Sequence, residues 1–482
     1  MTFVDEMNRL ANATYTDNGA FAYKSTDNVL LDLFARIGAL RNAPEEEILT
    51  LWRDARAADK ELADNMVLYA RNIRGGGCGE RRVGRILLKE LAKIDPSKVI
   101  RNFDTVVDCG RWDDLFCFID TPVEDEMWLY IRDQLIKDVE GMRAEAPISL
   151  LAKWLPSINT SSAATRETAR RACKKLDLTP RTYRKSLSAL RRYLDIVERR
   201  ISAREWDKIN FEAVPSLAMN RYIKQFNSHC QERFEEYKQS LAKGEAKINA
   251  ATLYPYDIVM PFFGYEEPDI AIANEQWKAL PNYVSEGSDV VVVADVSGSM
   301  TCDNCKPMAT SVGLAIYFAQ RNTGAYHNMY MTFSATPEIM KIEDNWDLTR
   351  CIKQVQKARW GFNTDLDATF ELIYNIAVKT NDTPKAIVII SDMQIDIATQ
   401  GNSDTITAKW QKKFEEAGLP PVKLIYWNVN SPKATFLAKA DDKVSFISGY
   451  GAAAFKHLPT LIEKSAVEAM VEILNKPEFA WK

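Results

Sequence analysis

The chain has 482 residues, of which 46% are hydrophobic and 27% are charged, and a net charge of −4 gives it no overall basic character. This composition is typical of a soluble globular protein, and the length predicts two or three domains. Because no apolar run approaches the ~20 residues of a bilayer-spanning helix and the N-terminus lacks the apolar stretch of a secretory signal, we expect a cytoplasmic protein without a membrane partner.

The first part of the chain, residues 1–284, has the pattern of consecutive amphipathic helices. Apolar residues recur every three or four positions in segments such as 28–42, 45–73 and 81–94. Asp95-Pro96 and Thr179-Pro180 have the form of helix starts, with a cap residue before a first-turn proline. Paired helices predict a HEAT-like α-solenoid, although no strict sequence period is present.

From residue 285 to 482, apolar strands alternate with helices. The expected strands are residues 288–295, 327–335, 385–391, 422–430 and 443–450. Helices are expected at residues 308–322, 348–358, 368–380, 405–418 and 461–475. Strands that are apolar on both faces predict a mostly parallel, Rossmann-like sheet covered on both sides, so the fold class is α followed by α/β. Ligands of such sheets bind at the carboxyl ends of the strands.

Oxygen-bearing side chains gather at three of these strand ends. Asp295, Ser297 and Ser299 follow the first strand, Thr364 lies in a loop before a helix, and Asp392 ends a later strand. Their hard oxygen atoms suit Mg²⁺ or another divalent cation such as Mn²⁺. Since five donors are too few to fill six positions, one position is left for water or for an acidic group of a partner.

Cysteine and histidine give no comparable pattern. The eight cysteines are dispersed, which predicts reduced thiols. Cys302 and Cys305 form a CxxC without a second pair, so two incidental loop thiols are favoured over a zinc site. The three histidines lie far apart in the sequence.

Sequence motifs of hydrolases and nucleotide-binding enzymes are absent. The chain contains no GxSxG, GxxxxGK[ST] or HExxH motif. The run from Gly75 to Gly79 follows a helix and lacks the GK[ST] ending of a phosphate loop. A structural role in a sharp turn is favoured for these glycines, and phosphate contact by Arg74, Arg81 and Arg82 is left open. We therefore expect a binding protein and no enzyme.

The segments DVSGSM, GFNTD and SDMQ, each placed after a strand, resemble the metal-ion-dependent adhesion site of von Willebrand factor A domains. The resemblance implies that Asp295, Ser297, Ser299, Thr364 and Asp392 bind the ion directly or through water. The neighbouring carboxylates are expected to start helices or lie on the surface; they are Asp303, Asp365, Asp367 and Asp396.

The helical part resembles the TROVE module of Ro ribonucleoproteins through RNIRGGGCGERR, GRWDDLF, LLAKWLPS, TPRTYRKSLSALRRYLDIVERR and VPSLAMNRY, in that order. The resemblance implies a monomeric ring closed by the A domain. It also implies binding of small structured noncoding RNAs or of the single-stranded ends of misfolded RNAs, as in RNA quality control. The alternative function is a protein-binding scaffold whose cation captures an acidic residue of a partner.

A basic segment supports an RNA partner independently. Between positions 160 and 208 there are fourteen Lys and Arg residues against six Asp and Glu residues, a local balance of +8. The candidate RNA-binding residues are Arg166, Arg170, Arg171, Lys174, Lys175, Arg181, Arg184, Lys185, Arg191 and Arg192. Tyr183 and Tyr193 lie among them and are candidates for stacking on bases. The alternative is a solvated face paired with Glu167, Asp195 and Glu198.

Overall fold

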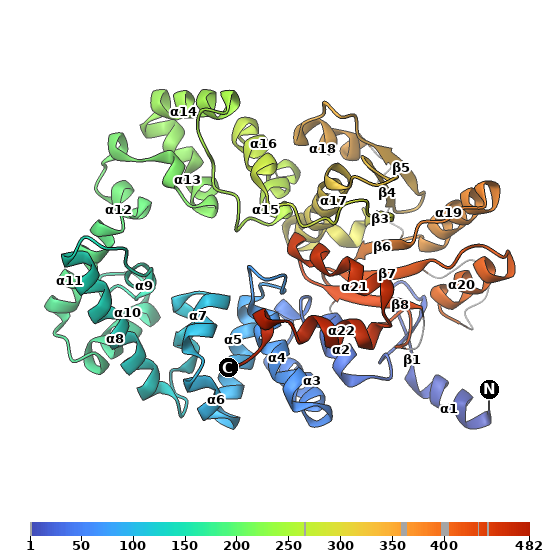
Figure 1. The fold of residues 1–482 in the computed structure, drawn as a ribbon, viewed down its shortest axis with the longest axis horizontal. Coiled ribbons are helices and arrows are strands. Elements are labelled where there is room, and N and C mark those ends of the chain that lie inside the picture. The colour runs from blue at the N-terminus through green and yellow to red at the C-terminus, as the bar shows by residue number, and fades with distance from the viewer. Residues whose placement is uncertain (1, 265–266, 358–363, 397–403, 432, 441–442) are drawn as a thin grey trace. The chain divides into compact units, whose positions relative to one another are not determined.

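A computed structural model describes residues 2–482 except 265–266, 358–363, 397–403, 432 and 441–442. The chain is mostly helical, with a mixed six-stranded sheet in its C-terminal part (Figure 1). It forms two compact units, which we call the sheet unit (Met1–Val83 and Ala250–Ala480) and the helical unit (Gly84–Asn249 with Trp481–Lys482). The boundary expected at 285 thus lies just before the first strand of the six-stranded sheet, but the two compact units divide the chain at other positions.

The sheet has the strand order β5-β4-β3-β6-β7-β8. The strands are β3 (Val290–Asp295), β4 (Met329–Phe333), β5 (Glu338–Lys341), β6 (Ala386–Ser391), β7 (Lys423–Asn428) and β8 (Val444–Ser448). All neighbours pair in parallel except β4 and β5, which are antiparallel. The mostly parallel sheet is therefore confirmed, and β5 is an edge strand that the sequence pattern did not predict.

Helices cover the sheet (Figure 1), and the strands beneath them are buried on both sides: every residue of β6 and β8 is buried. The helices that follow strands are α17 (Cys302–Arg321), α18 (Leu348–Lys357), α19 (Leu366–Thr380), α20 (Ile406–Glu416), α21 (Leu458–Glu463) and α22 (Ala466–Leu474). The single helix expected at 461–475 is divided because Ser465 and Glu468 form a capping box that starts α22 anew.

Parts of the chain that precede residue 285 belong to the sheet unit. The N-terminal helices are α1 (Phe3–Asn12), α2 (Val29–Arg36), α3 (Glu45–Ala58) and α4 (Lys60–Arg71), and two more are α15 (Pro255–Val259) and α16 (Ile270–Ala279). Helix α2 packs on β8, α4 on α22, and α15 on α17. The unit also contains an antiparallel hairpin of β1 (Ala13–Tyr15) and β2 (Phe21–Tyr23). The expectation of helices alone over 1–284 is wrong at this hairpin, whose strands are too short to show an alternating pattern.

The helical unit contains helices and no strand in any of its residues, all of which the structure describes. Its elements are α5 (Arg81–Ile94), α6 (Pro96–Ile100), α7 (Phe103–Cys109), α8 (Glu124–Arg143), α9 (Leu151–Trp154), α10 (Ala163–Lys175), α11 (Pro180–Tyr193), α12 (Val197–Ser202), α13 (Ser216–His229) and α14 (Gln231–Lys243). The helix starts predicted at Asp95 and Thr179 are confirmed, since each side chain accepts a first-turn backbone N–H. The predicted ring stays a prediction, because it concerns how the two units are placed.

None of the helices in the described part of the chain combines the length and the hydropathy that a bilayer-spanning segment requires.

Candidate functional site

The predicted cation ligands lie at the carboxyl edge of the sheet. Asp295 is the last residue of β3, and Asp392 directly follows β6, the neighbouring strand. The other neighbour of β3 is β4, which ends next to Ser334. Because β3, β4 and β6 run in parallel, their carboxyl ends meet at one place, where the sequence pattern predicted the site.

Hydrogen bonds connect four of the five predicted ligands into one cluster, in which Asp295, Ser297 and Asp392 are buried and Ser299 is exposed. The Asp295 carboxylate accepts from the backbone N–H of Ser297 at 2.9 Å and from the hydroxyl of Ser391 at 2.6 Å. The hydroxyls of Ser297 and Ser299 are 3.1 Å apart, and Ser299 also hydrogen-bonds to the carboxylate of Asp392. The structure thus brings Asp295, Ser297, Ser299 and Asp392 together.

The fifth predicted ligand, Thr364, is tied to both strands that flank β3. Its backbone N–H donates to the carboxylate of Asp396 at 2.7 Å, beyond the end of β6. The next residue, Asp365, donates its N–H to the carbonyl of Ser334 at 2.9 Å, beyond the end of β4. The Thr364 side chain is buried, and its hydroxyl has no hydrogen-bond partner among the described residues.

Three of the neighbouring carboxylates make different contacts. Asp365 caps α19 by accepting from the N–H of Ala368 at 2.9 Å, as predicted. Asp367 accepts from Lys409 and Trp410. Asp396 was expected to be a helix start or a surface residue, but its carboxylate holds the Thr364 loop. Gly361 and Asn363, two residues of the predicted loop motif, lie outside the described residues.

The electrostatics of the cluster favour a bound cation. Burial raises the pKa of Asp295, and the Asp392 carboxylate raises it further. Burial likewise raises the pKa of Asp392, and the Asp17 carboxylate adds to this shift. Burial disfavours the charged form of both carboxylates, and a divalent cation between them would stabilise that form. The hard oxygen donors fit Mg²⁺ or Mn²⁺, and so does the buried Thr364 hydroxyl, which lacks a partner within the described part of the chain.

A thiolate or imidazole metal site has less support. No group of three or more His, Cys, Asp or Glu side chains lies together for a metal ion in the described part of the chain. The structure describes all eight cysteines and joins no two of them by a disulfide. Cys302 is exposed and accepts a hydrogen bond from Asn430. The CxxC lies in the kinked first turn of α17, where residues 303–305 have positive φ, and not on a loop as expected.

The structure divides the ten candidate RNA-binding residues into two groups. Six have exposed side chains, and we call them the basic face: Arg170, Lys174, Arg181, Arg184, Lys185 and Arg192. On α11 the four basic-face residues fall on one side of the helix, opposite the buried Tyr183, Leu187 and Leu190. Within the basic face, Arg170 alone has an acidic partner in the described structure, Glu167 at 3.6 Å.

The other four candidates are engaged inside the helical unit. Arg166 donates to the carbonyls of Thr160 and Ser161, both at 2.7 Å. Arg171 binds Asp120 and Glu124, and Lys175 binds Asp125, all acidic residues near the start of α8. The guanidinium of Arg191 donates to Ala152 and Leu155 carbonyls and to the Ser157 hydroxyl. These four side chains make contacts within the helical unit and are not part of the basic face.

One stacking prediction is wrong. Tyr183 is 1% exposed and donates its hydroxyl to the carbonyl of Pro156 at 2.8 Å, so its ring cannot meet a base. Tyr193 is 39% exposed and donates to Ala146 at 2.9 Å, which leaves part of the ring accessible. The acids of the alternative interpretation mostly have other partners: Asp195 binds Arg200 and Glu198 approaches Lys153.

We expect Arg191→Ala to lower the free energy of unfolding of the helical unit by about 3 kcal/mol, because it leaves buried acceptors without donors. Its neighbour is a matched control. Arg192→Ala removes an exposed guanidinium and should change stability by less than about 0.5 kcal/mol. Urea unfolding followed by circular dichroism measures both changes, and equal effects of the two variants would contradict the assignment of Arg191 to the interior.

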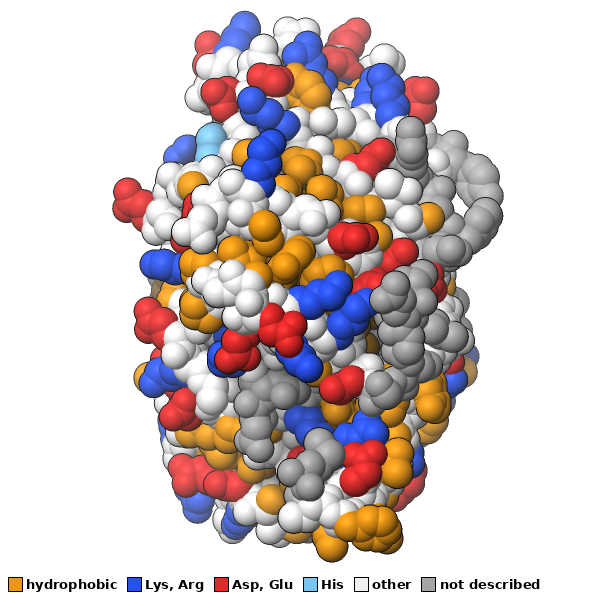
Figure 2. Space-filling model, turned by 90° about the vertical axis from the view of Figure 1, so that its right-hand side faces the viewer, with side chains coloured by type: hydrophobic (Ala, Val, Ile, Leu, Met, Phe, Trp, Pro, Cys, Tyr) orange, Lys and Arg blue, Asp and Glu red, His pale blue; other side chains and the backbone are white. Residues whose placement is uncertain are grey.

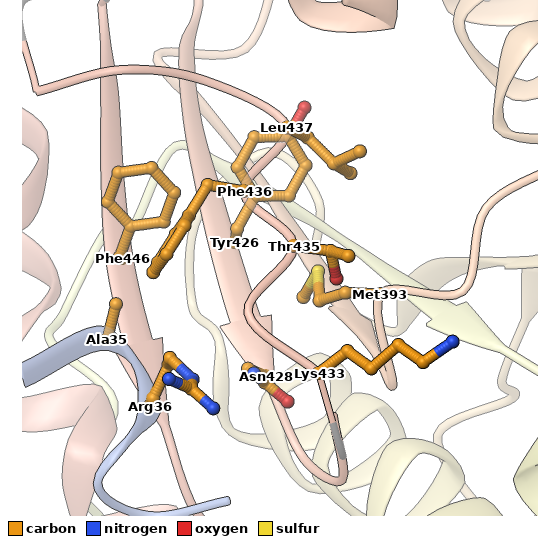
Figure 3. A pocket seen from close by; sticks show the side chains of 10 residues that line it. All are labelled: Ala35, Arg36, Met393, Tyr426, Asn428, Lys433, Thr435, Phe436, Leu437 and Phe446. Carbon is orange, nitrogen blue, oxygen red and sulfur yellow. The ribbon is translucent and has the colours of Figure 1, made fainter. Parts of the chain in front are cut away.

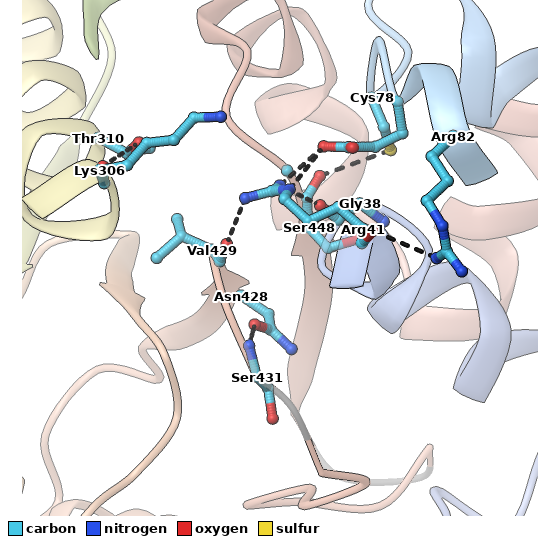
Figure 4. A network of polar contacts seen from close by, with 12 residues as sticks. Gly38, Arg41, Cys78, Arg82, Lys306, Thr310, Asn428, Val429, Ser431 and Ser448 are labelled. Carbon is cyan, nitrogen blue, oxygen red and sulfur yellow. Dashed lines mark hydrogen bonds and ion pairs between the residues drawn. The ribbon is translucent and has the colours of Figure 1, made fainter. Parts of the chain in front are cut away.

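The glycine-rich run forms the turn between α4 and α5, which confirms its structural role. A Cβ on Gly77 would lie 2.3 Å from the carbonyl oxygen of Tyr69, so only glycine fits this close approach. Arg82 donates to the carbonyl of Ala43 at 2.6 Å. It also donates to the carbonyl of Arg41 at 3.3 Å (Figure 4). The geometry therefore gives Arg82 a structural contact.

The sheet unit carries a cluster of oxygen donors, and the helical unit carries a basic face. Comparisons with known proteins identify chains that are similar to this one. Residues 289–477 match the family model described as domain of unknown function DUF7788, and residues 159–289 match domain of unknown function DUF2828. The two matches meet at 289, close to the change of pattern near 285.

One relative in a virus is similar over almost the whole chain. It is the uncharacterized protein L728 of Acanthamoeba polyphaga mimivirus, which is 26% identical over 97% of this chain and 88% of its own length. Among solved structures, the crystal structure of the Deinococcus radiodurans RO (RSR) protein aligns over 95% of both chains with 14% identity and a TM-score of 0.37. A TM-score of this size is too low to transfer the fold of that protein to this chain.

Proposed function

We propose that the chain is a non-enzymatic, Ro-like RNA-binding protein whose helical unit binds RNA through the basic face. The observation that carries this proposal is the row of cations on α11. Arg181, Arg184, Lys185 and Arg192 are exposed on one side of the helix, and no acidic partner is found for them in the helical unit, all of which is described. Unneutralised cations at this spacing attract phosphates without reading the base sequence.

The internal contacts of the other basic residues support this assignment. Arg171, Lys175 and Arg191 fix α10 and α11 against α8 and the segment around α9. A rigid platform lowers the entropy that is lost when the exposed side chains bind a ligand. The order of the TROVE-like motifs in the sequence favours small structured noncoding RNA or single-stranded RNA ends, in a ribonucleoprotein with a role in RNA quality control.

We also propose that the sheet unit is a von Willebrand factor A-type domain that binds one divalent cation, Mg²⁺ or Mn²⁺. Asp295, Ser297, Ser299, Thr364 and Asp392 would hold the ion, which supplies an electrophilic centre for an acidic group. The Thr364 hydroxyl, for which the described residues offer no hydrogen-bond partner, and the paired buried carboxylates support this part of the proposal. It favours a second candidate function, a scaffold that captures an acidic residue of a partner protein.

Binding, and no catalysis, is proposed for the cation site. A metal-assisted hydrolase needs a general base beside the ion. The histidines are held elsewhere: His457 contacts Gly76, His327 lies 3.5 Å from Asp344, and His229 stacks on Trp206. Incubation of the protein with RNA or nucleotides in Mg²⁺ or Mn²⁺ tests this point, and cleavage that Asp295→Asn abolishes would contradict it.

The RNA proposal is tested by gel-shift titrations at several salt concentrations. With five phosphate contacts on a single strand, the slope of about −0.7 per contact predicts roughly 100-fold weaker binding at ~200 mM than at ~50 mM salt. Neither the addition of EDTA nor Asp295→Asn should change this affinity, because the cation site is in the other unit. Absence of binding, or binding without salt dependence, would contradict the proposal.

A further inference from the structure

The turn between β1 and β2 lies on the segment that follows the cation-site residue Asp392. The Thr16 hydroxyl donates to the carbonyl of Ile395 at 2.5 Å, and the backbone N–H of Asp17 donates to the side-chain oxygen of Gln394 at 2.8 Å. The Asn18 amide donates to the carbonyl of Gln394 at 2.8 Å. Residues 16–18 are therefore fixed two to three positions beyond Asp392, although they lie near the other end of the chain.

The same turn also reaches the Thr364 loop. Gly19 forms a β-bridge with Asp396, and the Asn18 side chain hydrogen-bonds to the Asp396 carboxylate. That carboxylate holds the backbone N–H of Thr364 at 2.7 Å. Through Gln394 and Asp396, the turn supports two of the segments that carry the predicted ligands.

Two side chains of opposite charge, Asp17 and Lys433, lie at this turn. Asp17 is 43% exposed on its side chain, and its charge acts on the buried Asp392 carboxylate. Lys433, from the connection between β7 and β8, forms an ion pair with Asp17. Lys433 and Met393, the residue after Asp392, line one small cavity of about 20 Å³ (Figure 3).

We propose that the turn of residues 16–19 is part of the cation site, with Asp17 as a positioning residue whose carboxylate strengthens cation binding and Lys433 as the charge that opposes it. This inference rests on the proposed cation site of Asp295 and Asp392. The physical reason is Coulombic, since the Asp17 backbone is hydrogen-bonded to Gln394, two residues beyond Asp392, and a carboxylate there attracts a divalent cation whereas an ammonium repels it. In this proposal the N-terminal hairpin contributes to cation binding by the sheet unit.

Mn²⁺ binding to the full chain, followed by electron paramagnetic resonance of the free ion, tests the inference. We expect Asp17→Asn to weaken Mn²⁺ binding by about tenfold and Lys433→Met to strengthen it by a few fold, from the charge removed in each case. The opposite directions distinguish an electrostatic role from damage to the fold, because damage would weaken binding in both variants.

The chain offers a matched control in Asp27. This aspartate also belongs to the N-terminal segment and forms an ion pair, at 2.6 Å, with Lys439 of the same β7–β8 connection. Its other contacts include the Asn12 side chain and the Ser25 hydroxyl, on the far side of the hairpin from the Thr16 turn. Asp27→Asn keeps a residue type that tolerates its left-handed φ of 67° and should leave Mn²⁺ affinity within about twofold of wild type.

Two results would overturn the inference. Either Asp17→Asn binds Mn²⁺ as wild type does, or Asp17→Asn and Lys433→Met both weaken binding. A different result, equal Mn²⁺ binding by wild type and Asp295→Asn, would remove the cation site itself and the inference with it. That comparison does not involve Asp17, so the two failures are distinguishable.

Discussion

Reversing four charges of the basic face should weaken RNA binding several hundred-fold at ~100 mM salt. The variant carries Lys174→Glu, Arg181→Glu, Arg184→Glu and Lys185→Glu. At this salt concentration the release of counterions contributes about fivefold in affinity per phosphate contact on a single strand, so four lost contacts multiply to about 600-fold. The slope of log affinity against log salt should fall by roughly 3, and filter binding with a labelled small RNA measures both quantities.

The matched control reverses four exposed lysines of the sheet unit, which changes the net charge equally. These residues are Lys353, Lys357, Lys379 and Lys385. Figure 2, which faces the side that carries α19 and α20, shows Lys and Arg mixed with Asp and Glu, without a patch of one sign among its described residues. The control should therefore bind RNA within about fivefold of wild type, the value of one phosphate contact. Equal losses in both variants would mean that only net charge matters and would contradict a localised RNA site.

The second large effect that we expect is stabilisation of the folded protein by a divalent cation. At a concentration a hundredfold above its Kd, Mg²⁺ or Mn²⁺ should stabilise the folded protein by about 2.7 kcal/mol, which corresponds to a rise in Tm of roughly 5 °C. Asp295→Asn should abolish this rise. The metal-free variant should be no less stable than metal-free wild type, because an asparagine there still has an oxygen for the Ser297 N–H and no longer places charge beside Asp392.

Asp303→Asn is the control for this measurement. Asp303 is an exposed aspartate four residues after Ser299, and asparagine tolerates its φ of 47°. Its Tm should rise with cation as in wild type. Differential scanning fluorimetry with EDTA and with added Mg²⁺ or Mn²⁺ measures all three proteins. A cation-induced rise that persists in Asp295→Asn would contradict the assignment of the ligands.

Many helices and strands could be predicted because short stretches of sequence indicate them. The runs at 288–295 and 385–391 are apolar throughout, which reports strands buried on both faces. Thr179 and Pro180 mark the start of α11 through a side-chain cap and a fixed φ. The elements that were missed have little local signal, since β1, β2 and β5 have three or four residues each. The division into units depends on long-range packing of α2 on β8, which no periodicity reports.

In the candidate sites, too, the features with a local sequence signal were predicted and those that depend on long-range contacts were not. The five candidate ligands could be picked out because each follows a strand or lies in a loop at the sheet edge, whereas Asp17 lies near the other end of the sequence from Asp392. Ser391 stands beside Asp392, and its hydroxyl bond to Asp295 depends on the pairing of β3 with β6. The sequence shows that α10 and α11 are basic. It does not show which of their cations are exposed, because this depends on the neighbouring α8, whose acidic residues bind Arg171 and Lys175.

The most direct test of RNA binding by the basic face is to irradiate the full chain bound to RNA with ultraviolet light and to identify the crosslinked peptides by mass spectrometry. We expect crosslinks in the peptides of α10 and α11, between Ala163 and Tyr193. We also expect these crosslinks to disappear in the fourfold charge-reversal variant. Crosslinks confined to the sheet unit, with none between Ala163 and Tyr193, would contradict RNA binding by the basic face.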